Sequence, residues 1–255
     1  MSARITRLRN ALGLAVVALG SACAGTETGN PPFSGEVSAN AIATGSAVTL
    51  RSEGTVATVQ EVWVNLGQLE LGGADPCADA TGRIAPLGID DHGGPEAAPL
   101  PAIDNGGGYC RFRVDLPDQA FELPAGAPAA LSNHAVVLSG VTASGIPFEA
   151  AVSPATEVRL SAQAPVAFGA DAPRKVLAFD VSTWLENVDF DALEPVAGRI
   201  RLHSASDEGT DAGTAENEAA ARSIAERLAR GIALYPDEDG DGRPDSDIPL
   251  AEAAR

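Results

Sequence analysis

The chain has 255 residues, of which 45% are hydrophobic and 20% are charged. Acidic residues outnumber lysine and arginine by 35 to 17, so the formal net charge at pH 7 is −18. A surface this acidic repels nucleic acid and anionic lipid headgroups, which excludes a nucleic-acid-binding role. The length allows one large domain or one domain with an extension, and we expect the second arrangement.

The first 22 residues have the pattern of a secretory signal peptide. A basic start is followed by a short apolar run, 11–19, and then by small residues. The run is far shorter than the roughly 20 apolar residues that span a bilayer. It ends in Leu-Gly-Ser-Ala-Cys, which resembles a bacterial lipobox with Cys23 as the lipidated residue. Leu19 lies one position too early for that pattern, so cleavage by an ordinary signal peptidase near Ala22 is the alternative.

We therefore expect an exported protein that is lipid-anchored in the bacterial cell envelope, at the outer membrane, with its periplasmic or surface face left open. Each buried methylene of a lipid chain contributes about 0.8 kcal/mol of membrane affinity. Loss of residues 1–22 removes three arginines and no acid, and lowers the net charge from −18 to −21. The small, polar and proline-containing segment 23–35 predicts a flexible tether.

Residues 36–203 predict an antiparallel β-sandwich. Apolar and polar residues alternate in short segments, so each strand buries one face and exposes the other. These segments are 61–66, 111–116, 157–161 and 199–203. The segment 134–152 predicts a hairpin, and 174–181 a strand followed by a helical turn and loop at 182–193. Many short strands, with almost no helical pattern before residue 214, favour a sandwich.

Cys77 and Cys110 are the cysteines that remain after Cys23. An even pair in an exported chain favours a disulfide. The segment between the two cysteines is rich in Gly, Pro and Asp, and closing a loop of this size stabilises the fold by roughly 3–4 kcal/mol. Two buried free thiols are the alternative.

The acidic segment 204–214 predicts a linker, and 215–255 predicts a helix followed by an acidic loop, together forming an extension of the sandwich. Thr214 is placed to cap the helix, and Gly231 suits its C-terminal cap. A narrow apolar stripe predicts that the helix packs on the sandwich. The stripe consists of Ala220, Ile224 and Leu228.

The segment PDEDGDGRPD, residues 236–245, carries the strongest chemical pattern in the chain. Alternating carboxylates converge on one cation when the chain curls around it, and Gly242 supplies the left-handed residue that this curl needs. We expect one calcium ion here, with a solvated acidic turn as the alternative. The expected ligands are Asp237, Asp239, Asp241, the carbonyl of Arg243, Asp245 and Asp247.

The loop departs from an EF-hand at two positions. Ile248 stands where an EF-hand has its bidentate glutamate, and Pro244 lacks the N–H that paired loops use. Over nine residues the spacing instead resembles the loops of thrombospondin type 3 and dockerin repeats, although those occur in tandem and this loop is solitary. The missing acid predicts a weak site, with a Kd of about 10⁻⁴–10⁻³ M.

Catalytic patterns are weak in this sequence. We find no HExxH, no G-x-S-x-G and no phosphate loop, and Asp189 and Asp191 fit solvated loop carboxylates better than paired catalytic acids. A hydrolase with a dispersed Ser-His-Asp site is one alternative. A periplasmic copper-binding protein is another, which requires His134 to meet His92 or His203.

Three segments and the closing DEDGDG resemble a group of uncharacterised bacterial lipoproteins. The segments are GTETGNPP (25–32), VQEVWVNLGQLEL (59–71) and VLAFDVSTWL (176–185). The resemblance implies a surface or periplasmic β-rich domain and supplies no activity. The sequence as a whole predicts a non-enzymatic envelope protein with a structural or adhesive role, binding a protein or a glycan and stabilised by calcium.

Overall fold

The computed structural model describes part of the chain in full and several strands by their backbone alone. The fully described residues are 57–72 and 108–253, apart from 121, 169–171 and 204–213. All described residues belong to one compact unit, 32–255. None of the described helices is long and apolar enough to cross a membrane.

In the part of the chain that the structure describes, one sheet has nine strands, and neighbouring strands run antiparallel except for β1 and β12, which run parallel. In spatial order the strands are β5 (Gly82–Ile84), β4 (Leu69–Gly72), β8 (Gly107–Val114), β11 (Val158–Phe168), β15 (Ala251–Ala253), β14 (Ile232–Asp237), β12 (Arg174–Asp180), β1 (Val37–Ile42) and β7 (Ala98–Pro99).

The second sheet has six strands among the described residues, of which β10 and β13 run parallel and the other pairs antiparallel. Its strands are β13 (Ile200–His203), β10 (Pro147–Val152), β9 (Val136–Thr142), β3 (Val56–Leu66) and β2 (Ala47–Thr49), with β6 (Gly88–Asp91) also paired to β3. The prediction of a mainly β, sandwich-like fold is confirmed. The prediction that all strands run antiparallel is wrong for two pairs, β1–β12 and β10–β13. Alternation reveals which face of a strand is buried, and it says nothing about the direction of the neighbouring strand.

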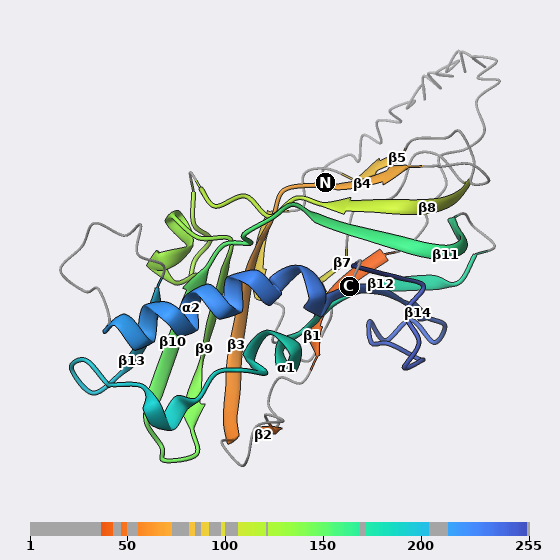
Figure 1. The fold of residues 1–255 in the computed structure, drawn as a ribbon. Helices are drawn as coiled ribbons and strands as arrows, with labels where there is room; N and C mark the ends of the chain where they lie inside the picture. Colours follow the sequence, from red (N-terminus) through yellow and green to blue (C-terminus); the bar gives the residue numbers. More distant parts are fainter. Residues whose placement is uncertain are drawn as a thin grey trace, which may run out of the picture. The chain divides into compact units, whose positions relative to one another are not determined.

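The helical elements lie between the later strands. They are η1 (Ala129–Ser132), α1 (Val181–Leu185), η2 (Phe190–Ala192), α2 (Ala215–Arg227) and η3 (Leu228–Gly231). In Figure 1, α2 crosses the face of the six-stranded sheet, where it contacts β13 and β10. The predicted cap is confirmed, because Thr214 Oγ1 accepts a hydrogen bond from Asn217 N at 3.4 Å. The buried stripe begins one residue later than expected, at Ala221 rather than Ala220.

Gly231 does not end the helix as a left-handed cap. The helix continues into η3, and Gly231 is absent from the described residues with positive φ. A Cβ at this position would lie 2.3 Å from Trp184 Nε1 and 2.8 Å from the carbonyl oxygen of Asp180. The fully buried Trp184 also donates a hydrogen bond to Leu228 O at 3.0 Å. Gly231 is therefore required by the close approach of α1, which sequence spacing does not show.

The C-terminal segment is part of the sandwich rather than an extension of it. β14 and β15 lie between β12 and β11 in the interior of the nine-stranded sheet. Ile232 and Leu234 of β14 are buried in the same hydrophobic cluster as Phe148 and Phe179 of the other strands. The predicted extension 215–255 thus contributes two strands to the nine-stranded sheet, which the sequence pattern does not indicate because the strand 232–237 is short and stands between the helix and the acidic loop.

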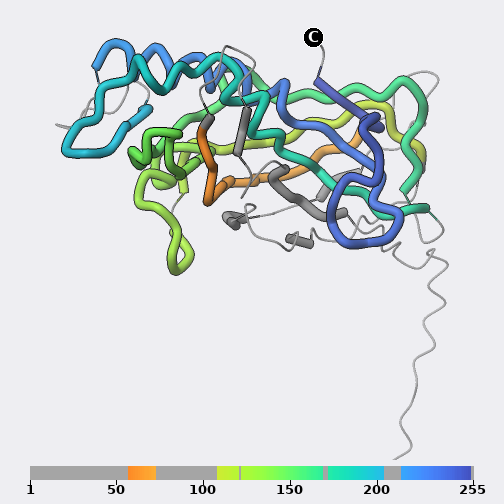
Figure 2. Tube along the Cα trace, turned by 90° about the horizontal axis from the view of Figure 1, so that it is seen from below, coloured from red at the N-terminus to blue at the C-terminus, as the bar shows by residue number. Residues whose placement is uncertain are grey.

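The loop between β14 and β15 leaves the sheet at one end of this unit. In Figures 1 and 2 the loop, in dark blue, lies far from the first turn of α2. Two backbone hydrogen bonds close it, from Asp245 N to Pro236 O at 3.1 Å and from Leu250 N to Leu234 O at 2.7 Å. The acidic residues are thus held at the end of the hydrogen-bonded strands β14 and β15.

Candidate metal site

The loop curls through successive hydrogen bonds from its backbone to its own carboxylates. Asp239 Oδ1 accepts from Asp241 N at 3.1 Å, and Asp241 Oδ1 accepts from Arg243 N at 2.8 Å. Gly240 and Gly242 have φ values of +76° and +78°, a backbone conformation that L-residues rarely adopt. The left-handed conformation predicted for Gly242 is confirmed, and Gly240 adopts it as well.

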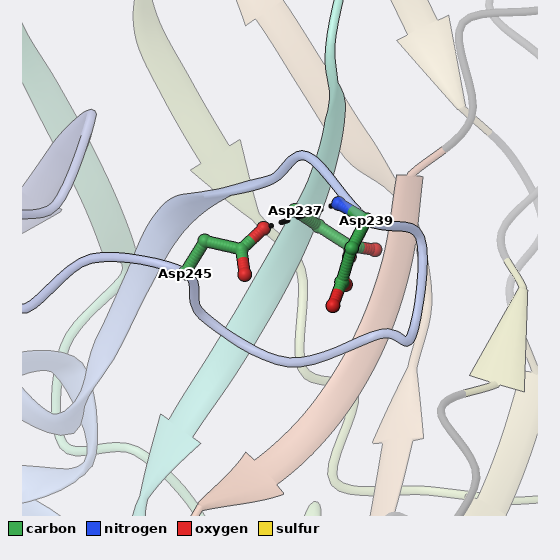
Figure 3. A group of neighbouring side chains, drawn as sticks. All are labelled: Asp237, Asp239 and Asp245. Carbon is green, nitrogen blue, oxygen red and sulfur yellow. Dashed lines mark hydrogen bonds between the residues drawn. The ribbon is translucent and has the colours of Figure 1, made fainter.

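Three carboxylates converge inside this curl. Asp237, Asp239 and Asp245 each offer one oxygen, and these oxygens lie within 4.8 Å of one another. Figure 3 shows the three side chains enclosed by the loop, with Asp245 reaching across from the opposite side. Backbone N–H groups bind these carboxylates as well: Asp245 Oδ2 accepts from Asp239 N at 3.3 Å, and Asp237 Oδ2 accepts from Gly242 N at 3.2 Å. The group has the donor set of a metal site.

Asp237 is the unusual member of this group. Its residue is 2% exposed, and its Oδ1 is buried without a hydrogen-bond partner. Burial raises the pKa of the Asp237 carboxyl above its usual range, and the negative charges of Asp241 and Asp239 act in the same direction. A buried carboxylate oxygen without a partner is costly, and a cation bound between this oxygen and its two neighbours would satisfy it.

The structure brings together part of the predicted ligand set. Asp241 and Asp247 are exposed and lie outside the group of three carboxylates, and Arg243 is exposed as well. Asp241 instead holds the curl of the loop through its bond from Arg243 N. The difference arises because alternating positions in an irregular turn do not all point inward, whereas the sequence pattern counts them equally.

Arg174 is a contact of the loop that sequence reasoning missed. Its Nη1 donates to Gly240 O at 3.4 Å, from the first residue of β12. A Cβ on Gly240 would lie 2.2 Å from Arg174 Nη1, so the guanidinium packs directly on the loop backbone. The signal is visible only in the register of β12 and β14, which pairs Arg174 with Asp237.

The histidines predicted as a copper alternative are partly brought together. The rings of His134 and His203 lie 5.9 Å apart, whereas His92 lies outside the described residues. His134 Nδ1 lies 2.9 Å from Ala130 O, and His203 Nε2 lies 3.4 Å from Glu149 Oε1. The hydrogen bond with His203 is the main cause that lowers the pKa of Glu149. Within the described residues these side chains do not form a group of three metal ligands.

The structure describes only some of the residues in the remaining predicted sites. Cys110 lies on β8, while Cys77 and Cys23 lie outside the described residues, so the disulfide and the lipidation stay predictions. Asp189 caps η2, because its Oδ1 accepts from Asp191 N at 3.1 Å. This pair has a structural role at the start of a short turn.

No protein-family model and no curated protein matches the chain. Among solved structures, MbnP from Methylosinus trichosporium is similar over 66% of this chain and 82% of its own, with 17% sequence identity and a TM-score of 0.36. A likeness this weak transfers neither fold nor function to this chain. The cluster of Asp237, Asp239 and Asp245, which offers oxygens to a metal ion, stands on the geometry of the loop itself.

Proposed function

We propose that this protein is a non-enzymatic, lipid-anchored β-sandwich of the bacterial cell envelope whose β14–β15 loop binds one calcium ion. Its role is structural or adhesive, toward a protein or a glycan. The observation that carries the metal site is the buried Oδ1 of Asp237, which has no hydrogen-bond partner, in a residue whose carboxylate converges with those of Asp239 and Asp245.

Calcium fits the donors of this loop better than other common ions. The group offers carboxylate oxygens alone, which suits hard cations and disfavours zinc and copper, whose sites use nitrogen and sulfur. Calcium accepts six to eight oxygen ligands in flexible geometry, so waters and a backbone carbonyl complete the shell of an irregular loop. Magnesium demands near-ideal octahedral geometry, which a curled loop with three acids does not supply.

Calcium would stabilise the sandwich through the position of the loop. The loop joins two neighbouring strands of the nine-stranded sheet, so a bound ion opposes the separation of β14 from β15. At a free concentration a hundredfold above Kd, binding to the folded state alone adds about 2.7 kcal/mol of stability. With three carboxylates in the group, we expect the Kd to lie at the weak end, about 10⁻⁴–10⁻³ M.

Calorimetry tests the metal site. Calcium chloride is titrated into the mature chain with Cys23→Ser, which leaves the compact unit intact. We expect one ion per chain, and magnesium chloride should give at least about tenfold weaker binding. Asp239→Asn combined with Asp245→Asn should abolish the heat. The matched control is Asp247→Asn, which lies outside the group and should bind calcium like the parent.

Two results would overturn the assignment of calcium. One is the absence of heat at millimolar calcium with the folded parent chain. The other is equal loss of binding in the double variant and in Asp247→Asn, because a site that depends equally on every acid is a diffuse negative charge. Circular dichroism of each variant shows that the sandwich is still folded.

The lipid anchor is tested separately in cells. The lipobox-like ending predicts that labelled palmitate enters the wild-type chain at Cys23 and does not enter Cys23→Ser. Cleavage by an ordinary signal peptidase would instead give an unlabelled, soluble chain in both cases. Equal labelling of the two chains would place the lipid elsewhere.

A copper-binding function is the second candidate, favoured by the approach of the His134 and His203 rings to 5.9 Å. Imidazole nitrogen is a good ligand for copper, and both rings lie at the same end of the six-stranded sheet, His134 just before β9 and His203 at the last residue of β13. Titration with Cu²⁺, followed by electron paramagnetic resonance, should show nitrogen coordination in the wild type. Loss of this signal in His134→Ala and in His203→Ala would support the site, and an unchanged signal would exclude it.

A further inference from the structure

A cavity of about 550 Å³ lies beside the metal loop. It is lined by the last half of β11, the first residues of β12 and the segment 248–252 that leads into β15. Apolar side chains come from β11 and from the segment 248–252, among them Val166, Leu250 and Ile248, and Ile248 is 76% exposed. Sites for small ligands usually enclose about 300–1,000 Å³ and are mostly apolar, so this cavity has the size and lining of one.

Lys175 is the only lysine in the chain, and it lines this cavity. The residue is 4% exposed. Its Nζ donates a hydrogen bond to Pro173 O and lies 4.9 Å from the centroid of the Phe168 ring. Among the described residues no carboxylate forms an ion pair with this ammonium. The cavity lining therefore includes a buried lysine whose ammonium has a carbonyl oxygen and an aromatic ring as its partners.

This environment favours binding of an anionic ligand. An ammonium has three donors, and a buried charge without a counter-charge is disfavoured unless it is paired. Burial lowers the pKa of Lys175 to about 8, so the group is still mostly protonated at neutral pH. A ligand carboxylate would give the ammonium a charge-assisted hydrogen bond, which is roughly twice as strong as a neutral one.

The other charged side chains of the lining are better solvated. Arg174 and Glu238 are exposed, and Glu252 is half-buried. Water screens such groups, so they contribute little to the choice of a ligand. Lys175 is the buried charge of the lining, and its sign sets the preference of the cavity.

We propose that this cavity binds a small amphipathic carboxylate. Its carboxylate pairs with the ammonium of Lys175, and its apolar body packs against β11 and the segment 248–250. A medium-chain fatty acid has this chemistry and fits the volume. The proposal is independent of calcium, because it uses none of the three carboxylates of the metal site.

Octanoate and octanol are the probes that test the proposal, because they share an apolar body and differ in charge. Both are titrated against the mature chain carrying Cys23→Ser, with ligand-observed NMR as the readout. We expect octanoate to bind at least about tenfold more tightly than octanol. Lys175→Met should reduce this preference to less than about twofold, and Lys175→Arg should keep it.

Three outcomes would overturn the proposal. They are equal affinity of the wild type for both probes, an unchanged preference in Lys175→Met, and failure of the folded wild type to bind either probe. The titrations are repeated with the calcium chelator EGTA, so that a failure of the metal site is distinguishable from a failure of this one.

A second measurement does not depend on a folded variant. In the wild type, a limiting amount of acetic anhydride acetylates amines, and peptide mass mapping follows the product at Lys175. Octanoate should slow this acetylation at least about tenfold, since a paired and covered amine is a poor nucleophile. Octanol should not slow it, and the α-amino group of the same chain is the internal control. Equal protection by both probes, or protection by neither, would contradict the pairing of Lys175 with a carboxylate.

Discussion

Replacing Lys175 by methionine should stabilise the protein at neutral pH. Methionine has a similar length and no charge, so it fills the same space beside Phe168 without a buried cation. The loss of the hydrogen bond to Pro173 O is a small effect beside the removal of a desolvated charge. The expected gain follows from the pKa of Lys175, which burial lowers from its usual 10.5 to about 8.

The magnitude comes from the difference between the two pKa values. A lowering from 10.5 to about 8 corresponds to a destabilisation of about 3 kcal/mol when the lysine is protonated in both the folded and the unfolded chain. This penalty is fully present below pH 8. Between pH 8 and 10.5 the unfolded chain binds more protons than the folded chain, so the stability of the wild type rises with pH. At pH 10 the remaining penalty is about 1 kcal/mol.

Urea denaturation of wild type and Lys175→Met at pH 7 and pH 10 measures this penalty. We expect Lys175→Met to be more stable by about 1–3 kcal/mol at pH 7, and we expect the difference to shrink toward about 1 kcal/mol at pH 10. Taking the difference between the two chains cancels the tyrosines, which titrate in both. Lys175→Arg keeps the charge and should show no gain.

Two results would refute this reasoning. A Lys175→Met chain that is equal to the wild type or less stable at pH 7 would mean that the ammonium is well solvated or paired. A stability difference that stays constant from pH 7 to pH 10 would show that the gain comes from packing and not from the charge.

Three further predictions concern the close contact of α1, its cap and the loop. Gly231→Ala should lower the free energy of unfolding by about 1–3 kcal/mol, because the new Cβ would lie 2.3 Å from Trp184 Nε1. Gly72→Ala is the control: the nearest atom to its new Cβ is 3.9 Å away, and the free energy of unfolding should change by less than about 0.5 kcal/mol. Asp180→Ala should cost about 1–2 kcal/mol in urea denaturation, because its carboxylate caps the first turn of α1, and an unchanged midpoint would contradict this role. Removal of calcium by EGTA should raise the rate of protease cleavage within 237–247 at least about tenfold, as measured by mass spectrometry. A cleavage rate that does not change with EGTA would contradict a calcium ion bound in this loop.

The sequence by itself determined the features that depend on neighbours a few residues apart. Alternation placed Val62 and Val64 inside and Glu61 outside, and the segment 134–152 forms the β9–β10 hairpin. Thr214 caps α2, and Gly242 adopts the left-handed conformation that its loop requires. These features were predictable because caps, turns and strand faces follow from local hydrogen bonds and side-chain periodicity.

The tertiary structure alone decided the features that depend on distant partners. The insertion of β14 and β15 between β12 and β11, and the two parallel strand pairs, follow from the order in which strands meet. A glycine becomes essential at Gly231 because Trp184 packs on it from another helix.

The same division runs through the candidate sites. The spacing of the acids predicted a metal loop, but the burial of Asp237 beside β12 selected the carboxylates that converge. Lys175 carried no signal in the sequence, since a lysine in an alternating strand is expected to reach water. Its ammonium is buried because Phe168 and Pro173 cover it in the fold. Local chemistry fixes which groups a segment offers, and long-range packing fixes which of them lose water.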